Sequence, residues 1–579
     1  MNTFYKVLAI CSAVTVFGCN KFIDVQPKGV ISEDLAMSQP DEMVTAAYAK
    51  LGDDWYTYPF NLWPYGDLSS DDCYKGGSGT TDTDYHAVEV WSNLTSSTPG
   101  GHMDELWYQL YCSVSRCNRA LISLRDYGKD SLGEETAKVR EAEVRFLRAH
   151  FYFKLVQMWY QVPWVDEEVY ENHTEEQTKN NAFSHEELMG KIVDDFKFAY
   201  DNLPATQADG GRANKIAAAA YLAKCYLTMA WGDGYEASTG VSHINAQHMQ
   251  QVLTYTQVVA ESAYGYLEDY GDIFLPEYKN SKESIFAVQH SHYEDDNTRF
   301  GRANWSNMLN GCWGMWSCGW DFHKPSQNLV NAFRTQDGLP MFEHFNDDIA
   351  YPVNGDPNAQ KWDPRLFHTV AMPTFPYKYE AAYTMTTDNS RNPSTYGYYS
   401  SLKEVPQRSN GEVYDNPWQA FPMNDYVLRY TDVMLMRAEA LIETGSLNEA
   451  RSIVNDIRQR AMNSVGKHIG YAANQCQIAL YPESDFNTKE KARVRLQWER
   501  RLEMAMEYDR FFSLRRWGIA SATLNKFFEK EQNSVYGDQA YAGYYKDAHF
   551  TPAKNEYFPI PYPQMYYVPG LYTQNKNYN

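Results

Sequence analysis

Apolar residues recur at every third or fourth position along much of the first half of the chain, which is the spacing that places side chains on one face of an α-helix. The pattern runs through 107–117 and again through 144–158, where Val162 and Pro163 end it because proline cannot continue a helix. A third run, 216–229, is rich in alanine and gives a thin face that another helix can approach closely. These runs predict packed helical hairpins.

A second helical block begins at Tyr430. Gly445 is placed as its C-terminal cap, and 450–457 form the next apolar stripe. Two helices of about 14 residues joined by a glycine turn are typical of tetratricopeptide-like pairs, although the usual consensus residues are absent. The chain is therefore predicted to be mainly α, with a helical scaffold over about 35–275 and 426–525.

The segments 53–101 and 277–425 depart from this pattern. They carry much of the proline and glycine, many aromatic residues and few helical runs. Disordered segments lack so many aromatic residues, so both are predicted to be folded parts of a loop-rich ligand lobe. Loops held by a rigid scaffold are where binding sites usually lie.

The first nineteen residues have the features of an export signal. Lys6 gives a positive start, 7–17 is an apolar run of eleven residues, and Cys19 follows a small residue. A run of this length is too short to cross a hydrocarbon core of ~30 Å, so residues 1–18 are predicted to be a cleaved lipoprotein signal peptide. Cys19 would then become the lipidated N-terminus, and an ordinary signal peptide with a chance cysteine is the alternative.

Charge restricts the possible partners. The chain has 52 Lys and Arg residues against 74 Asp and Glu residues, a formal net charge of -22 at pH 7. Such a surface repels phosphate groups, which argues against nucleic acid and anionic lipid as partners. By itself the charge selects no ligand.

Known catalytic and metal-binding patterns are absent from the sequence. It has no GxSxG, HExxH, GxxxxGK[ST] or GxGxxG motif, and its nine cysteines match no zinc spacing. Some pair of carboxylates at glycosidase separation is expected by chance among 74 acidic residues, so that feature supports no enzyme. No catalysis, cofactor or metal is predicted. Cys312 and Cys318 flank a loop and could close a short disulfide.

Aromatic residues give a stronger signal. They make up 15% of the chain, and Trp305, Trp313, Trp316 and Trp320 lie within sixteen residues. A sugar ring has an apolar C–H face and a polar rim, so a flat aromatic side chain beside carboxylate, amide or guanidinium groups matches both surfaces. The alternative is that these tryptophans fill the core of the lobe, although tryptophan is rarely buried completely.

The first loop segment also carries candidate ligand contacts. Asp71, Asp72, Asp82 and Asp84 surround a glycine-rich turn, and Trp91 follows. The acidic residues could form a hydrogen-bonding rim for sugar hydroxyls, a calcium loop or a solvated turn, and calcium is the weakest interpretation because their order does not match a calcium-loop pattern. We predict that sugar rings stack on Trp91, Trp313, Trp316 and Trp320, and that hydroxyl groups donate to Asp71 and Asp72.

The segment 498–518 mixes arginine and glutamate with apolar residues at helical spacing. An anion site is one interpretation. The structural interpretation is favoured, in which arginines and glutamates of neighbouring helices pair inside a partly buried network.

Several short motifs occur in a fixed order from end to end: CNKFIDVQPKG at 19–29, ESIF at 283–286, DPRL at 363–366, RYTDVMLMRAEA at 429–440, ERRLE at 499–503, RRWG at 515–518, and FPIP at 558–561 before Gln574 and Asn575. As a set they resemble the SusD/RagB family of surface nutrient-binding lipoproteins. The resemblance implies a single, mostly α-helical unit over 19–579 with four tetratricopeptide-like helix pairs and no catalysis. It also implies a role as the extracellular lid of a SusC-like TonB-dependent transporter, with oligosaccharide ligands.

The prediction is therefore a lipid-anchored glycan-binding protein of the outer membrane that captures oligosaccharide or polysaccharide and passes it to this transporter. It is expected to face the cell exterior, although Lys21 precedes the single Asp24 where such export tends to use acidic residues. Two alternatives stay open. One is a lid subunit that contacts the transporter without binding sugar, and the other is a surface glycosidase.

Overall fold

Long helices form where the apolar spacing predicts them. The computed structural model describes residues 32–95, 97, 101–237, 244–292, 302–316, 319–347, 360–413, 419–533, 535–536, 539–540 and 544–578, without the side chains of 236–237 and 535–540. The longer helices are α3 (Pro40–Ala49), α5 (His102–Ser123), α7 (Glu134–Trp159), α9 (His185–Asn202), α10 (Lys215–Ala230), α12 (Ala246–Ala260), α16 (Tyr430–Thr444), α17 (Leu447–Asn463), α18 (Lys489–Glu503) and α20 (Ala520–Asn533).

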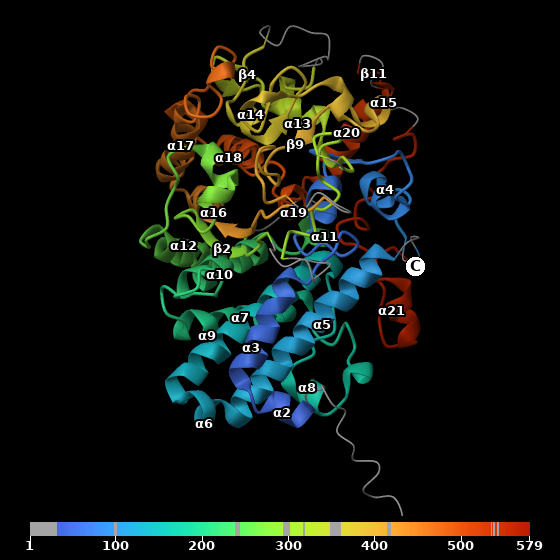
Figure 1. Cartoon of the computed structure of the whole chain (residues 1–579), viewed down its shortest axis with the longest axis vertical. Helices are drawn as coiled ribbons and strands as arrows, with labels where there is room; N and C mark the ends of the chain where they lie inside the picture. The colour runs from blue at the N-terminus through green and yellow to red at the C-terminus, as the bar shows by residue number, and fades with distance from the viewer. Residues whose placement is uncertain are drawn as a thin grey trace, which may run out of the picture.

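These helices pack one against the next in a continuous array. Along the first half of the chain, α3 packs on α5, α5 on α7, α7 on α9, α9 on α10, and α10 on α12. The array then continues into the second half, because α12 packs on α16, which in turn contacts α17 and α18 (Figure 1). The mainly α fold predicted from the sequence is confirmed.

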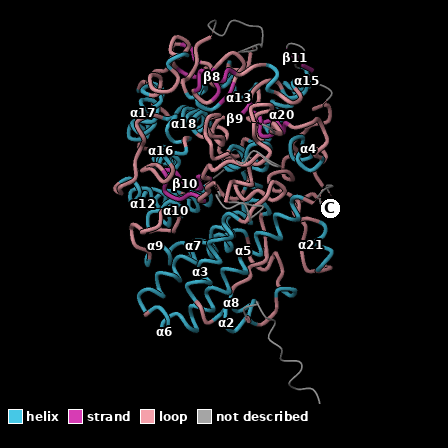
Figure 2. The backbone as a smooth tube through the Cα atoms, viewed as in Figure 1, coloured by secondary structure: helices cyan, strands magenta, loops and turns pink. Residues whose placement is uncertain are grey.

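Shorter elements occupy the upper half of the molecule in Figure 1 and the ends of the array. Figure 2 shows mostly loops in this upper half, which is called the loop-rich half below. The short helices are α2 (Glu33–Met37), α4 (Thr83–Val90), α6 (Lys129–Leu132), α8 (Glu167–Glu171), α11 (Gly234–Ala237), α13 (Gln327–Ala332), α14 (Arg365–Thr369), α15 (Pro393–Tyr396), α19 (Arg510–Arg516) and α21 (Tyr562–Tyr567).

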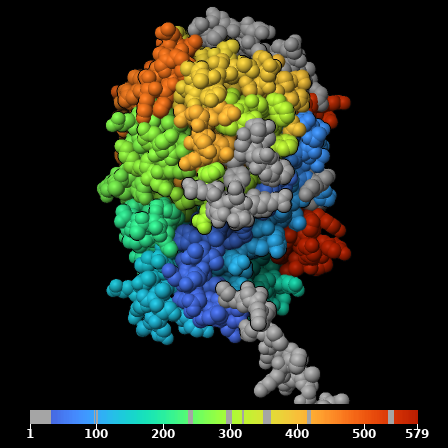
Figure 3. Space-filling view, in the orientation of Figure 1, coloured from blue at the N-terminus to red at the C-terminus, as the bar shows by residue number. Residues whose placement is uncertain are grey.

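Strands among the described residues form two-stranded antiparallel pairs. They are β1 (Cys73–Gly76) with β3 (Phe322–Pro325), β2 (Ser284–Val288) with β10 (Asp425–Arg429), β4 (Thr335–Gln336) with β5 (Leu339–Pro340), β6 (Val370–Ala371) with β9 (Ser400–Ser401), β7 (Pro376–Tyr377) with β8 (Glu380–Thr384), and β11 (Val535–Tyr536) with β12 (Gln539–Ala540). In Figure 3 blue early segments cover most of the lower part of the visible face and yellow and orange later segments most of its upper part, while the red C-terminal segment lies at the lower right.

Two helix ends show how local sequence sets the boundaries. α16 stops at Gly445, which adopts φ +94 and whose N–H caps the carbonyl groups of Ile442 and Leu441, as predicted. α7 ends at Trp159, before the predicted stop at Val162 and Pro163, because Tyr160 adopts φ +61. The proline therefore lies beyond the helix and does not end it.

The alanine-rich helix α10 lies at the centre of the main core. Ala217, Ala218, Ala219 and Ala220 are fully buried, and the helix contacts α9, α12 and α16. Small side chains allow this close approach on several sides, as the thin face in the sequence predicted. Within the described residues, no helix combines the length and the apolar character needed to cross a membrane.

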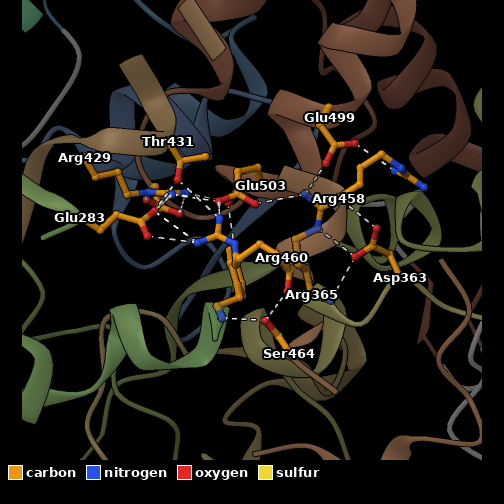
Figure 4. A network of polar contacts seen from close by, with 12 residues as sticks. Glu283, Asp363, Arg365, Arg429, Thr431, Arg458, Arg460, Ser464, Glu499 and Glu503 are labelled. Atoms are coloured by element: carbon orange, nitrogen blue, oxygen red, sulfur yellow. Dashed lines mark hydrogen bonds and ion pairs between the residues drawn. The ribbon is translucent and has the colours of Figure 1, made fainter. Parts of the chain in front are cut away.

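A buried network of ion pairs joins the loop-rich half to the helices (Figure 4). At its centre, Glu503 of α18 contacts three guanidinium groups, those of Arg365, Arg429 and Arg460, at 3.1, 2.9 and 2.5 Å. Arg365 also pairs with Glu499 at 2.6 Å. Arg365 belongs to α14, Arg429 ends β10 and Arg460 belongs to α17, so the network connects four elements. The predicted pairing of arginines and glutamates inside a buried network is confirmed.

Electrostatics keep this cluster ionised. Burial alone would raise the pKa of Glu503, but the guanidinium groups of Arg460, Arg429 and Arg365 outweigh burial and hold that pKa well below its usual range. The contribution of Glu503 to stability is therefore present above the ordinary pKa of glutamate, about 4.3, and is lost as the pH falls below it.

Replacing Glu503 with glutamine should lower the free energy of unfolding by about 3–5 kcal/mol, because three buried arginines lose a shared negative charge. Chemical denaturation at pH 7, followed by circular dichroism, measures the change. Lys129→Ala is the matched control, since Lys129 pairs with Glu134 where both side chains are exposed, and its midpoint should equal that of the wild type. A wild-type midpoint for Glu503→Gln would show that the network does not stabilise the fold.

Candidate functional site

An exposed aromatic group forms a candidate site in the loop-rich half. The side chain of Trp313 is 40% exposed, and that of Trp320 is partly exposed. The guanidinium carbon of Arg391 lies 5.3 Å from the ring centre of Trp313 and 5.1 Å from that of Trp320. One planar cation therefore joins two indoles, and these three residues are called the aromatic platform below.

Buried polar contacts hold the platform in place. Asp321, next to Trp320, accepts hydrogen bonds from the backbone N–H of Arg391 at 2.9 Å and from Lys324 Nζ at 2.7 Å. The side-chain amide of Asn389 donates to the carbonyl oxygen of Trp313 at 3.0 Å. Two segments far apart in the sequence are thus fixed against each other.

The first loop segment reaches this place through the β1–β3 pair. Gly76 lies opposite Phe322, and the N–H of Gly77 donates to the carbonyl oxygen of Asp321 at 3.0 Å. Gly76 adopts φ +80, and a Cβ atom there would lie 2.0 Å from the same oxygen, so the turn requires glycine. The two loop segments singled out in the sequence therefore meet beside the platform.

A second pairing of rings and a cation involves Trp316. The guanidinium carbon of Arg408 lies 5.9 Å from the ring centre of Trp316 and 5.8 Å from that of Tyr383. Trp316 is buried, and its ring packs on Tyr377 and Phe421 with centres 5.6 and 5.1 Å apart. The predicted stacking of a sugar on Trp316 is contradicted because core residues occupy its surroundings, whereas Tyr383 is the exposed ring of this group.

Trp91 is a core residue, which corrects its predicted role. Its side chain is 1% exposed, and its indole N–H donates to the carbonyl oxygen of Ser69 at 3.0 Å. Its ring centre lies 5.0 Å from that of Phe511 and 5.1 Å from those of Phe550 and Phe558. With rings packed around it, Trp91 leaves no face for a ligand.

Asp71 and Asp72 are buried, contrary to the prediction of an accessible hydrogen-bonding rim or a solvated turn. Arg501 Nη2 lies 2.5 Å from Asp72 Oδ1 and 3.0 Å from Asp71 Oδ2, and Arg510 Nε lies 2.9 Å from Asp71 Oδ1. Burial would raise the pKa of Asp71, but the charges of Arg501 and Arg510 outweigh it and lower the pKa. These carboxylates therefore hold the first loop segment against α18 and α19.

The remaining sequence candidates are also accounted for. Trp305 is buried in a core cluster beneath the loops, as the alternative interpretation expected. Cys312 carries a free, buried thiol, and burial raises its pKa to about 12, which makes it unreactive. Cys19 and Cys318 lie outside the described residues.

Sequence reasoning did not find Arg391, Arg408 or Tyr383. All three lie in the loop-rich segment 277–425, where no apolar period marks which side chains face the same way. A guanidinium group that can lie over an aromatic ring is the one chemical signal available. The sequence does not show which arginine meets which tryptophan, because that pairing depends on how distant loops pack.

Among the described residues, Asp269, Asp272 and His468 form the one group that could hold a metal ion, with ligand atoms within 4.8 Å of one another. Lys467 Nζ lies 2.7 Å from each carboxylate oxygen of Asp272 and already supplies a compensating positive charge. The group is therefore satisfied as an ion-pair cluster, and no metal role is assigned to it.

Two family models match this chain: one described as the SusD family covers residues 282–578, and one described as "Starch-binding associating with outer membrane" covers residues 25–227. The first covers half of the chain, so the protein belongs to the SusD family. The resemblance found in the sequence motifs is confirmed.

Individual relatives agree with this family. A SusD-like protein of Bacteroides ovatus is 23% identical over 530 residues, which span 88% of this chain and 82% of the relative. A laminarin-binding SusD-like protein superposes with a TM-score of 0.62 at 20% identity, covering 93% of this chain and 99% of its own. A structure solved with a xylogluco-oligosaccharide gives a TM-score of 0.63 at 20% identity, covering 91% and 97%. At these identities the structural likeness concerns the fold.

A buried histidine lies two residues after Asp321, the carboxylate that fixes the platform. His323 of β3 contacts Glu404 at 2.8 Å through Nδ1 and Asp67 at 3.0 Å through Nε2. Burial alone would lower the pKa of His323, but the carboxylates of Glu404 and Asp67 outweigh it and raise the pKa to about 9. The protonated imidazole thus connects β3 to the two segments that carry Asp67 and Glu404.

The raised pKa of His323 makes stability depend on pH. The histidine of the unfolded chain titrates near pH 6.5, so the stabilisation is fully present below that pH and is lost as the pH rises through about 9. The free energy of unfolding of the wild type should fall by an amount on the order of 3 kcal/mol more than that of His323→Gln between pH 6 and pH 10. Urea denaturation across this range measures the difference, and parallel curves for the two proteins would rule out a charged His323.

Proposed function

We propose that the protein binds oligosaccharides on the aromatic platform. The observation that carries the proposal is the half-open indole of Trp313 beside Trp320, with the Arg391 guanidinium lying over both rings. Indole faces match the C–H faces of sugar rings, and the guanidinium donates hydrogen bonds to hydroxyl oxygens at their edges. Tryptophan loses little rotamer freedom on binding, so this arrangement costs little entropy.

The relatives support a carbohydrate as the ligand. One structural neighbour binds laminarin and another was solved with a xylogluco-oligosaccharide, while one family description names starch binding. These glycans differ in linkage and share the pyranose ring, which has an apolar C–H face. Stacking accepts such differences, because it contacts ring faces and not a single hydroxyl pattern.

The wider role we propose is capture followed by transfer to a SusC-like TonB-dependent transporter, without catalysis. Cys19 would carry the lipid that anchors the chain in the outer membrane, with the protein facing the cell exterior. A family model described as associating with the outer membrane supports this location. A net charge of -22 would keep the protein away from anionic surfaces, so the lipid supplies the attachment.

A second candidate function is an interaction subunit that contacts the transporter without binding sugar. It is favoured by a group of exposed tyrosines on α5 and α21 that shares no residue with the platform, namely Tyr108, Tyr562, Tyr566 and Tyr567. Exposed aromatic groups are common at protein interfaces. Copurification with the transporter, without binding to any glycan of a broad array, would favour this alternative.

Removing the exposed indole tests the binding site. Trp313→Ala should weaken oligosaccharide binding about tenfold or more, which corresponds to about 1.4 kcal/mol, because a central aromatic contact is lost. Isothermal titration calorimetry with laminarin, xylogluco-oligosaccharide and maltoheptaose measures the affinity. Tyr127→Ala is the control, since Tyr127 is 41% exposed on the helical half and should bind as the wild type does. Unchanged affinity in Trp313→Ala would refute the site.

The anchor has its own test. Cys19→Ser should move the protein from the membrane fraction to the soluble fraction, because serine cannot form the thioether that carries the lipid. Fractionation and immunoblotting of the native host measure this, with Cys112→Ser as a cysteine control that keeps its membrane association. Retention of Cys19→Ser on the membrane would contradict a lipid anchor at this residue.

A further inference from the structure

A cleft in the structure shares no residue with the aromatic platform. Its volume is about 730 Å³, and it is bounded by α18, by the turn 342–347 and by α20. Figure 1 places α18 and α20 in the same half of the molecule as the loop-rich segments. The cleft therefore opens where the end of one helix, a loop and a C-terminal helix converge.

One wall of the cleft is aromatic and held rigidly. Trp498 is half-buried, and Phe342 and Phe345 meet its ring edge-on with centres 5.8 and 5.1 Å away. The guanidinium carbon of Arg501 lies 5.4 Å from the ring centre of Trp498 and 5.1 Å from that of Phe345. A guanidinium group placed over two rings is also the arrangement of the platform, and here it occurs on a different part of the chain.

The floor of the cleft is polar and already fixed. Arg501 and Arg510 are held by Asp71 through contacts of 3.0 and 2.9 Å, and the side-chain amide of Asn328 donates to Asp71 Oδ2 at 3.1 Å. The side-chain amide of Asn346 in turn donates to Asn328 Oδ1 at 2.9 Å, so the polar groups of the floor are linked by hydrogen bonds. Fixed donors and acceptors beside a flat ring are what a sugar with an apolar face and hydroxyl edges requires.

Charge balance indicates which ligand suits the cleft. Its lining has four basic side chains and four acidic ones, which are Arg501, Arg510, Lys526 and Lys530 against Asp71, Glu343, Asp347 and Glu529. The mutual pairing of Arg501, Arg510 and Asp71 leaves no concentrated positive charge at the floor. A polyanion would gain little here, so the site suits a neutral ligand.

We propose that this cleft is a second binding site for a neutral oligosaccharide, separate from the aromatic platform. Its 730 Å³ falls within the roughly 300–1,000 Å³ range of small-molecule sites, which is room for a few sugar rings. The inference rests on the proposed function, since it assigns the same ligand class to a second place. A long glycan that contacts both sites would be held more tightly than by either one alone, whereas a short oligosaccharide would bind each site independently.

Site-resolved binding can be measured with 5-fluorotryptophan and ¹⁹F NMR on the full mature chain. The Trp498, Trp313 and Trp320 signals are assigned with Trp498→Phe, Trp313→Phe and Trp320→Phe, and the protein is titrated with laminarin, xylogluco-oligosaccharide and maltoheptaose. The Trp498 signal should shift with at least one of these probes. It should also shift in the double variant Trp313→Ala/Trp320→Ala, because the cleft binds sugar without the platform.

The outcomes separate the two proposals. If the Trp313 or Trp320 signal shifts on titration and the Trp498 signal does not, the second site is overturned and the proposed function is kept. If none of the three tryptophan signals shifts with any of the three glycans, both the second site and the proposed function are overturned. A Trp498 shift that disappears in the double variant would also overturn an independent second site, because the signal would then report platform binding.

A variant that fills the cleft tests the site without removing the packed ring of Trp498. Ala522 is exposed on α20 and lines the cleft, so Ala522→Trp should fill the space while leaving Trp498 and its neighbours in place. It should abolish the Trp498 shift and weaken binding of long laminarin about threefold or more, while Trp313 still responds. Ala205→Trp is the matched control, since Ala205 is exposed in the loop after α9 and lines neither the cleft nor the platform, and this variant should behave as the wild type. Full Trp498 response in Ala522→Trp would overturn the assignment of this cleft.

Discussion

The buried carboxylate of Glu503 is the feature on which the rest of the structure depends. It holds Arg365, Arg429 and Arg460, and thereby ties α14, β10 and α17 to α18. Moving charges out of water is costly, and a lone buried pair would contribute little stability. Here each guanidinium and carboxylate has several partners, so desolvation is offset by shared contacts, and removing any one member leaves the others uncompensated. The loop-rich half consequently has a fixed position on the helical array.

Buried charged groups with several partners also occur next to the aromatic platform. Asp321, which follows Trp320 in the chain, is buried and accepts hydrogen bonds from Lys324 Nζ and from the backbone N–H of Arg391. His323 holds a proton between Glu404 and Asp67. Loops without regular hydrogen bonding are held by charge-assisted bonds to buried groups, which are short and directional. An exposed aromatic platform can then keep its shape before a ligand arrives, and binding costs less ordering entropy.

The binding that we propose for this scaffold uses aromatic rings that meet guanidinium groups. At the platform Arg391 lies over Trp313 and Trp320, and at the cleft Arg501 lies over Trp498 and Phe345. The two places differ in support, since the platform belongs to loops and Trp498 and Arg501 belong to a helix. A SusD-family protein with two such sites could hold a long glycan along its surface while one end is passed onward, which is the behaviour we propose for capture and transfer.

Sequence alone determined the features that arise from local spacing. The helices around 107–117, 144–158 and 216–229, the glycine cap at Gly445 and the pairing of arginines with glutamates all follow from periodicity or residue chemistry within a short window. Tertiary structure decided which candidate side chains reach solvent. Trp91 is buried because the rings of Phe511, Phe550 and Phe558 pack around it. Asp71 and Asp72 are paired with arginines more than 400 positions away in the chain. Arg391 came to lie over Trp320 for the same reason: contacts between distant segments depend on the packing of the whole chain, which no local pattern encodes.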